Sequence, residues 1–254
     1  MCVGILTRFH QGWRLDWFEV DRVGLGKPLE RRGKEFALFE LLQNAWDQEV
    51  TRVAIVLQKE PGSRYATIRI EDDDPSGFKS LEHAWTLFAE SGKKGDPEKR
   101  GRFNLGEKLV LAVCSEAEIV STTGAVRFDS EGRQRLRKRR ERGTVFEGRI
   151  RMTNEEHQAC VAAIRRVLPP KDVKTTFNGE ELSWREPLAE MGATLATEVA
   201  DEEGALRPRR RKTVVRVVSP RPGEVGSVYE MGIPGRRDGP RLPCRRPAEG
   251  AARA

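Results

Sequence analysis

The chain is poor in cysteine, histidine and tyrosine, with four, three and two of these residues among 254. Its cysteines (Cys2, Cys114, Cys160 and Cys244) are far apart and form no Cys-x2-Cys pair, which argues against structural zinc and predicts reduced thiols in a cytoplasmic protein. Long apolar runs are also missing. Since no stretch approaches the roughly 18 apolar residues of a membrane span and residues 1–11 lack a signal-peptide pattern, no membrane partner is expected.

The net charge is +7, but most of the chain carries no excess of Lys and Arg over Asp and Glu. Residues 207–254 hold 13 Lys and Arg residues against four acidic ones, a balance of +9, so residues 1–206 sum to −2. The hydrophobic fraction of 37% allows one good core plus a smaller appendage. The basic character is therefore expected to belong to the C-terminal tail and not to the folded body.

The most informative stretch is the apolar segment 36–46, which predicts a helix buried almost all round. Glu40, Asn44 and Asp47 follow one another at i, i+4 and i+7, so they lie on one face of that helix. Two carboxylates and an amide on a buried helix are costly unless they face a wet or ligand-filled cavity. An acid with an amide one turn away suits a magnesium–phosphate site. The alternative, a solvated stripe on a surface helix, conflicts with the apolar residues on the other faces.

The second pattern is a run of aspartates that follows the strand predicted at 65–70. Asp72, Asp73 and Asp74 follow it and lead into a turn that ends at Gly77. Neighbouring carboxylates repel one another, so a specific role is expected; an aspartate at a strand end can accept a hydrogen bond from an amino group such as that of adenine. An Asx-type turn or a calcium loop is the alternative, although the turn supplies few further oxygen ligands.

The third pattern is a glycine-flanked turn that opens a helix. Its members are Gly101, Phe103, Asn104, Leu105, Gly106 and Lys108. Backbone N–H groups at a helix N-terminus bind phosphate, and glycine allows close approach. Taken alone this pattern is weak, because it does not match the lysine-containing P-loop and a single lysine is more often a solvated surface residue.

Hydrophobic periodicity and turn signals order the rest of the chain. Helices are predicted at 36–49, 80–89, 106–115 and 153–168, and strands at 16–23, 50–57, 65–70, 118–123, 125–128, 144–151 and 213–218, with a short hairpin around Asn178-Gly179. Residues 90–102 are predicted to form a mobile loop, and 133–142 a basic run inside a connection. Because βαβ alternation is missing, the fold class is predicted to be an α+β sandwich, one mostly antiparallel sheet with helices on one face.

Composition shifts suggest four regions. They are a loose segment at 1–15, the main domain at 16–170, a partial second β-containing region at 171–233 and a disordered basic tail at 234–254. The tail is either a native arm or the product of a truncated reading frame.

Together, the patterns resemble the Bergerat-fold ATPases, the group that contains gyrase-type topoisomerases, the large ATP-driven heat-shock chaperone, histidine kinases and the MutL proteins. The family's Glu-x3-Asn-Ala-x-Asp box is matched by Glu40, Asn44, Ala45 and Asp47. Its second and third boxes correspond to residues 72–77 and to Gly101, Phe103, Asn104 and Gly106, and Gly143-Thr144 resembles the family's Gly-Thr. The resemblance covers roughly residues 20–168. It implies a two-layer α/β sandwich of the histidine kinase-like ATPase type with a short, incomplete C-terminal extension.

The resemblance also implies roles for the matched residues. Glu40 would be the general base and Asn44 the magnesium ligand. Asp72, or Asp73 in the alternative register, would hold adenine with support from the Thr144 hydroxyl. The segment 101–108 would cradle the phosphates, and residues 90–102 would form a lid in which Ser91, Lys93 and Lys94 could touch phosphate. The chain departs from the family at Asp74 and Ser76, where glycines are usual, and at Asn104, which replaces a glycine.

Two functions follow. Histidine kinases generally carry asparagine at the position of Glu40 and need a phosphoacceptor histidine, which His10, His83 and His157 are not placed to provide. We therefore expect a magnesium-dependent ATPase whose lid closure on ATP gates homodimerisation or the binding of a partner. The alternative is a non-hydrolysing nucleotide-binding module whose basic segments 133–142 and 207–254 bind DNA or another partner. A solvated loop is an equal alternative for 133–142.

Overall fold

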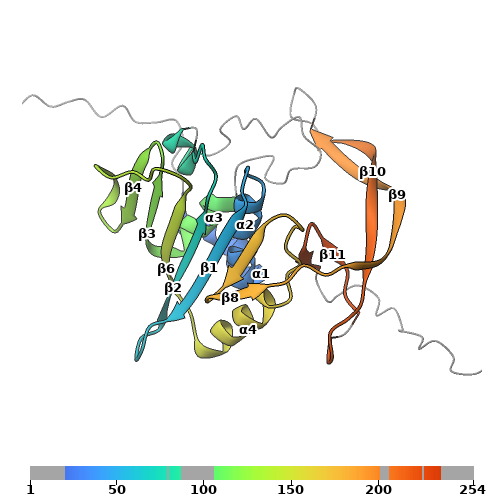
Figure 1. Ribbon diagram of the computed structural model, residues 1–254. Helices are drawn as coiled ribbons and strands as arrows, with labels where there is room; N and C mark the ends of the chain where they lie inside the picture. The colour runs from blue at the N-terminus through green and yellow to red at the C-terminus, as the bar shows by residue number, and fades with distance from the viewer. Residues whose placement is uncertain (1–20, 79, 87–105, 201–205, 225, 236–254) are drawn as a thin grey trace, which may run out of the picture.

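The computed structural model describes residues 21–78, 80–86, 106–200, 206–224 and 226–235 (Figure 1). Its helical elements are α1 (Arg22–Arg32), α2 (Glu35–Trp46), the 3-10 turn η1 (Leu81–Ala84), α3 (Gly106–Val113) and α4 (Asn154–Ile164). The strands are β1 (Arg52–Lys59), β2 (Tyr65–Asp72), β3 (Cys114–Ser121), β4 (Gly124–Asp129), β5 (Gly132–Leu136), β6 (Val145–Arg151), β7 (Lys174–Phe177), β8 (Glu180–Leu182), β9 (Pro187–Ala200), β10 (Leu206–Val218), β11 (Tyr229–Glu230) and β12 (Ile233–Pro234).

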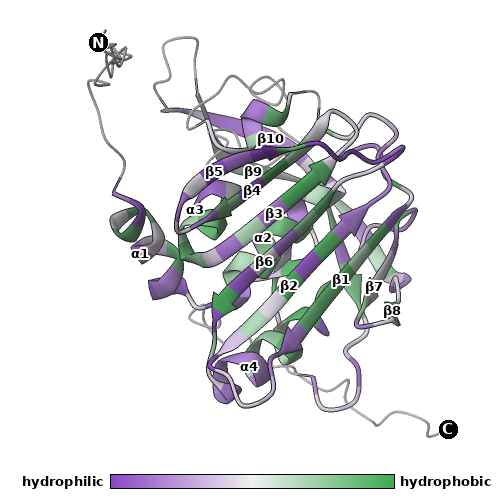
Figure 2. Ribbon diagram, turned by 90° about the vertical axis from the view of Figure 1, so that its left-hand side faces the viewer, coloured by the Kyte–Doolittle hydropathy of each residue, from purple (hydrophilic) through white to green (hydrophobic). Residues whose placement is uncertain are grey.

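Eight of these strands form one sheet, in the order β5-β4-β3-β6-β2-β1-β7-β8. Every neighbouring pair is antiparallel except β1 and β7, which run parallel. Helix α2 packs on β1 and β2, α3 on β3 and β6, and α4 on β1. Figure 2 shows the strands in front and these helices behind them. The predicted two-layer α+β sandwich, with a mostly antiparallel sheet and helices on one face, is confirmed.

The core lies between the sheet and α2. Alternate residues of β1 and β2 are buried, and Ile55 stands opposite Ile70 in the register of the pair. Leu38 and Leu42 of α2 lie one turn apart and are fully buried above these strands. Burying one such aliphatic side chain contributes about 1.5–3 kcal/mol, so this layer fixes the position of α2 on the sheet.

Several predicted elements are confirmed with shifted ends. The helix predicted at 36–49 is α2, the predicted strand pair is β1 and β2, and the predicted hairpin is β3 and β4. The capping box of Thr153 and Glu156 opens α4, with both reciprocal hydrogen bonds formed. Asn178 and Gly179 both adopt positive φ angles, 49° and 86°, in the predicted turn between β7 and β8.

Four expectations were wrong. The described end of the strand predicted at 16–23 is not a strand: the Asp21 carboxylate accepts from the Val23 N–H and caps α1, which begins at Arg22. Ser80 caps a helical turn as predicted, but the turn ends at Ala84. The basic run 133–142 is not wholly a connection, because it begins inside β5. We expected a loop before the strand predicted at 213–218, but the chain there forms β9 and the first part of β10, and these two strands pair along almost their whole length.

Beyond the sheet, β9 and β10 form a two-stranded ribbon that lies to one side of the sandwich in Figure 1. The domain ranges remain a prediction, although the main sheet continues past residue 170 through β7 and β8, and Pro234 lies in β12. Residues 1–15 and the rest of the predicted tail are outside the described ranges. In the part of the chain that the structure describes, no helix has both the length and the apolar character needed to cross a lipid bilayer.

Candidate functional site

The polar face of α2 has the partial burial that its spacing predicts. Glu40, Asn44 and Asp47 are each half-buried. The helix ends at Trp46, and the backbone N–H of Asp47 donates to the Gln43 carbonyl at 3.0 Å. The remaining faces carry the buried residues Ala37, Leu38, Phe39, Leu41, Leu42 and Ala45. The stripe therefore borders the core without being solvated like a surface helix.

Glu40 lies against the first residue of α3. A Cβ atom added to Gly106 would overlap the Oε2 atom of Glu40 and would stand 3.1 Å from its Cδ atom. Glycine leaves room for this approach, and a larger residue would require the Glu40 carboxylate to shift. The N-terminus of a helix carries a partial positive charge that favours a carboxylate, so α3 helps to hold Glu40 there. The structure thus brings together the first and third sequence patterns, which are 66 positions apart at Glu40 and Gly106.

Asp72 lies at the end of β2 and is held by backbone groups. Its Oδ1 atom accepts from the N–H of Thr144 and from the N–H of Asp74, each at 3.1 Å. Its own N–H donates to the Thr144 carbonyl at 3.0 Å. Gly143 fits beside this pair with φ of +73°, and an added Cβ would overlap the Asp72 carbonyl. The Gly143-Thr144 dipeptide is therefore shaped to fit Asp72.

Burial raises the pKa of the Asp72 carboxyl to about 6, although the two backbone hydrogen bonds act in the opposite direction. The neighbouring carboxylates of Asp74 and Asp73 add a smaller upward contribution. A half-buried carboxylate whose charge is disfavoured in this way is a strong acceptor for a donor that enters the site. The raised pKa distinguishes Asp72 from Asp73, whose pKa is lowered.

Asp73 is already engaged with the start of β1. Its Oδ1 accepts from the backbone N–H groups of Thr51 and Arg52 at 2.8 and 2.9 Å, and its Oδ2 accepts from the Thr51 hydroxyl at 2.6 Å. The Nη2 atom of Arg142 lies 3.6 Å from the Oδ2 atom of Asp73. Burial alone would raise the pKa of Asp73, but these hydrogen bonds outweigh it and hold the pKa below its usual range. The geometry favours a structural role for Asp73 and leaves Asp72 as the candidate acceptor.

The acidic turn rests on the β3–β4 hairpin. Asp74 is buried, and its Oδ1 accepts from the Ser76 N–H at 2.9 Å, which is the Asx-type geometry. Gly77 has φ of +57°, and an added Cβ would stand 2.5 Å from the Oγ of Ser121. The Phe78 N–H donates to that same Oγ at 2.7 Å. Both the angle and the contact require glycine at position 77.

Ser121 is a site residue that the sequence did not reveal. It is fully buried, and its hydroxyl lies 3.0 Å from the Thr144 hydroxyl while it accepts from Phe78. It therefore joins the acidic turn to the Gly143-Thr144 segment. A lone serine at the end of a hairpin strand gives no signal of such a role.

Lys108 lies in the first turn of α3, as predicted, but it is buried and its ammonium donates to the carbonyl of His83. Its contact with phosphate stays a prediction. The other predicted phosphate-loop residues, Gly101, Phe103, Asn104 and Leu105, lie outside the described residues, as do Ser91, Lys93 and Lys94.

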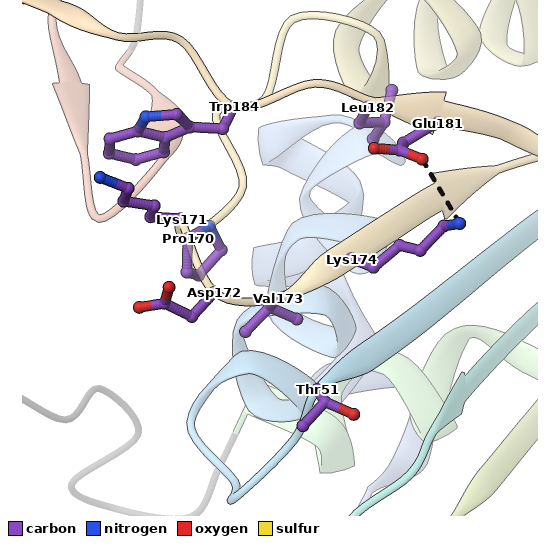
Figure 3. Close-up of a pocket in the computed structure, with 9 residues that line it drawn as sticks. All are labelled: Thr51, Pro170, Lys171, Asp172, Val173, Lys174, Glu181, Leu182 and Trp184. Carbon is purple, nitrogen blue, oxygen red and sulfur yellow. Dashed lines mark ion pairs between the residues drawn. The ribbon is translucent and has the colours of Figure 1, made fainter.

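A pocket of about 370 Å³ lies elsewhere, where β7 and β8 meet the start of β1 (Figure 3). In Figure 3, Trp184 and Lys171 lie at the left and Thr51 lies below, while Lys174 at the right pairs with Glu181 at 3.5 Å across the β7–β8 hairpin. None of the predicted site residues lines it. Thr51 connects this pocket to the site through its hydrogen bonds to Asp73.

No family model matches the chain, and no curated protein matches it. Among solved structures, the chain is similar to the ATPase region of Saccharomyces cerevisiae topoisomerase II, at 14% identity over 58% of this chain and 48% of that one, with a TM-score of 0.45. The structure of the same region bound to ICRF-187 (dexrazoxane) is 14% identical over 59% of this chain and 48% of that one, with a TM-score of 0.46. The ATPase and transducer domains of DNA topoisomerase II from Balamuthia mandrillaris are 15% identical over 59% of this chain and 48% of that one, with a TM-score of 0.42. The chain thus spans about half the length of each match.

Proposed function

We propose that the chain binds ATP with magnesium at the site formed by α2, the end of β2 and the start of α3, and that it hydrolyses ATP to ADP and phosphate. The observation that carries this proposal is the contact of the Glu40 carboxylate with Gly106. It places an acid at a helix N-terminus, the part of a protein best suited to phosphate. Asn44 lies one turn further along the same face of α2.

Asp72 supports the adenine end of the proposal. An exocyclic amine needs a hydrogen-bond acceptor, and the Asp72 carboxylate is half-buried with one oxygen fixed by Thr144 and Asp74. Binding an amine would compensate the cost of burying this charge. The register with Asp73 as the adenine acceptor is less favourable, because both of its oxygens already accept hydrogen bonds.

Magnesium usually takes one or two protein oxygens and fills its other positions with water and phosphate. Asn44 offers an amide oxygen of this kind, and the described residues include no group of three or more His, Cys, Asp or Glu side chains that could hold a metal. Bound magnesium would neutralise phosphate charge. Glu40 would orient a water and accept its proton during attack on the terminal phosphate.

The gating part of the proposal rests on the sequence resemblance. Closure of residues 90–102 on ATP, homodimerisation and release after hydrolysis would follow the hydrolytic branch of the family. Light scattering of the full chain with and without a non-hydrolysable ATP analogue tests the dimer. An unchanged mass under saturating analogue would contradict nucleotide-driven dimerisation.

The test of the catalytic proposal compares ATP turnover and ATP binding in Glu40→Ala, Glu40→Gln and wild type. Glu49→Ala is the matched control, because Glu49 follows α2 directly and is exposed. Turnover should fall by 100-fold or more in both Glu40 variants, roughly the contribution of a general base, while binding persists. Unchanged turnover would remove the role of Glu40. Binding without turnover in the wild type would favour the non-hydrolysing module.

A further inference from the structure

One edge of the main sheet carries a concentrated positive charge. We define the basic rim as Arg133, Arg135, Arg137, Lys138 and Arg139, which run from the edge strand β5 into the segment before β6. All five side chains are exposed. The sandwich as a whole has no such surplus, because residues 1–206 sum to −2. The rim is therefore a local feature of this edge.

The segment that carries the rim is fixed to the sheet. The Arg140 N–H donates to the Ser121 carbonyl at 3.0 Å, and the Arg140 guanidinium donates to Glu71 at 2.6 Å. The Nε–H of Arg142 donates to the Asp73 carbonyl at 2.5 Å. Two arginines thus anchor the segment inward and hold Arg137 and Arg139 on a defined backbone. A surface that is ordered in advance loses less entropy when a partner binds.

Three rim arginines have no acidic partner among the described residues. Arg135 pairs with Glu82 at 2.8 Å, and Lys138 pairs with Glu118. Arg137 and Arg139 make no ion pair within the described ranges, and the Arg133 guanidinium lies over the Trp85 ring, 4.3 Å from its centroid. A surplus of uncompensated guanidinium groups is thus exposed at one place.

The opposite edge of the same sheet shows that edge protection does not require this surplus. Exposed charges on an edge strand deter pairing with other chains, which is the simplest explanation for any charged edge. At the β8 edge, Glu180 pairs with Arg165 at 3.2 Å and Glu181 pairs with Lys174 at 3.5 Å. That edge is protected by balanced ion pairs, so the excess positive charge at the β5 edge needs another reason.

We propose that the basic rim binds the phosphate backbone of nucleic acid without selecting a base sequence. Guanidinium groups form bidentate hydrogen bonds to phosphate, and Arg137 and Arg139 are exposed on a backbone that Arg140 and Arg142 hold to the sheet. The Trp85 ring already contacts Arg133 and Arg135, whose guanidinium groups lie 4.3 and 5.6 Å from its centroid, so no base stacking is assigned to it. Contacts are made to the backbone only, and binding weakens steeply with salt. The rim residues are not themselves among the proposed ATP-site residues, but their segment joins that site through the contacts of Arg140 with Ser121 and of Arg142 with Asp73.

The test is a titration of the full-length chain against a fluorescently labelled mixed-sequence DNA duplex, followed by anisotropy at several salt concentrations. The variant Arg137→Ala/Arg139→Ala removes two rim charges. The control Arg64→Ala/Arg151→Ala removes two exposed charges at the other end of the sheet, where β2 begins and β6 ends. We expect the rim variant to bind on the order of tenfold more weakly, with a salt slope lower by about 2, and the control to bind like wild type.

Equal losses in the two variants would show a general charge effect and overturn the proposal. An unchanged affinity and slope in the rim variant would also overturn it, since binding would then belong to another segment such as the basic C-terminal one. Poly-glutamate that displaced the duplex as effectively as unlabelled DNA would assign the rim to acidic polypeptides instead. Circular dichroism of each variant, unchanged from wild type, excludes unfolding as the cause of a loss.

Discussion

The carboxylate of Glu40 lies so close to Gly106 that a Cβ atom added there would overlap its Oε2 atom, so a larger residue would displace the carboxylate. Two segments far apart in the sequence meet at this point, and the placement of the acid depends on a missing side chain.

We therefore expect Gly106→Ala to move the Glu40 carboxylate and lower ATP turnover about 10–100-fold, because small misplacements of a catalytic group are costly. Gly192→Ala is the control, since an added Cβ at Gly192 meets nothing within 4 Å. Steady-state turnover and nucleotide affinity are measured for both. Equal turnover in the Gly106 variant and wild type would separate Glu40 from the chemistry.

Asp72→Asn should stabilise the nucleotide-free protein above pH 6 while weakening its affinity for ATP. The folded pKa of about 6 lies above the unfolded value of about 3.9, so this carboxyl favours the folded state at low pH and loses that contribution as pH rises through 6. Asparagine keeps an oxygen for the Thr144 and Asp74 donors without the buried charge. The gain in unfolding free energy should be about 1–3 kcal/mol at pH 8 and disappear near pH 4, as measured by urea denaturation. A loss of stability at pH 8, or unchanged ATP affinity, would contradict one half of this prediction.

Asp73→Ala should destabilise the fold by about 2–4 kcal/mol, because three donors from Thr51 and Arg52 lose their acceptor. The pKa of Asp73 is lowered, so its contribution is present above about pH 4 and is lost as pH falls further. Urea denaturation at pH 7 and pH 3 should show a smaller difference from wild type at the lower pH. A penalty of equal size at both values would mean that the charge is unimportant.

Gly77→Ala and Gly62→Ala separate backbone strain from crowding. Both glycines have positive φ, +57° and +65°, but only the Cβ at position 77 would meet other atoms, 2.5 Å from Ser121 Oγ and 2.7 Å from Thr122 Oγ1. We expect a loss of about 1 kcal/mol at Gly62 and about 2–4 kcal/mol at Gly77. Thermal denaturation of both variants measures the difference. Equal losses would show that the Ser121 contact relaxes freely.

Sequence periodicity predicted the elements whose residues alternate or repeat clearly. The apolar face of α2 and the alternating residues of β1 and β2 gave the centre of the sandwich, and the Thr153–Glu156 box gave the start of α4. The strand β9 was missed because Pro187–Ala200 mixes alanine, glycine and glutamate, and its structure depends on pairing with β10. The strand β5 was missed because its residues are polar.

The sequence patterns named candidate site residues, but the roles of these residues stay a prediction. Spacing placed Glu40, Asn44 and Asp47 on one face, but it could not distinguish Asp72 from Asp73. That difference arises from long-range contacts, Thr51 and Arg52 with Asp73, and Gly143-Thr144 with Asp72. Ser121 was invisible for the same reason.

The parallel pairing of β1 with β7 joins Arg52 to Lys174, so this side of the sheet closes only after the chain between them has folded. A nascent or proteolysed chain that ends before Lys174 would leave β1 as an edge strand, unpaired on one side, that carries the apolar residues Val53 and Ile55. Such fragments are expected to aggregate or to bind chaperones until β7 and β8 pair with the sheet.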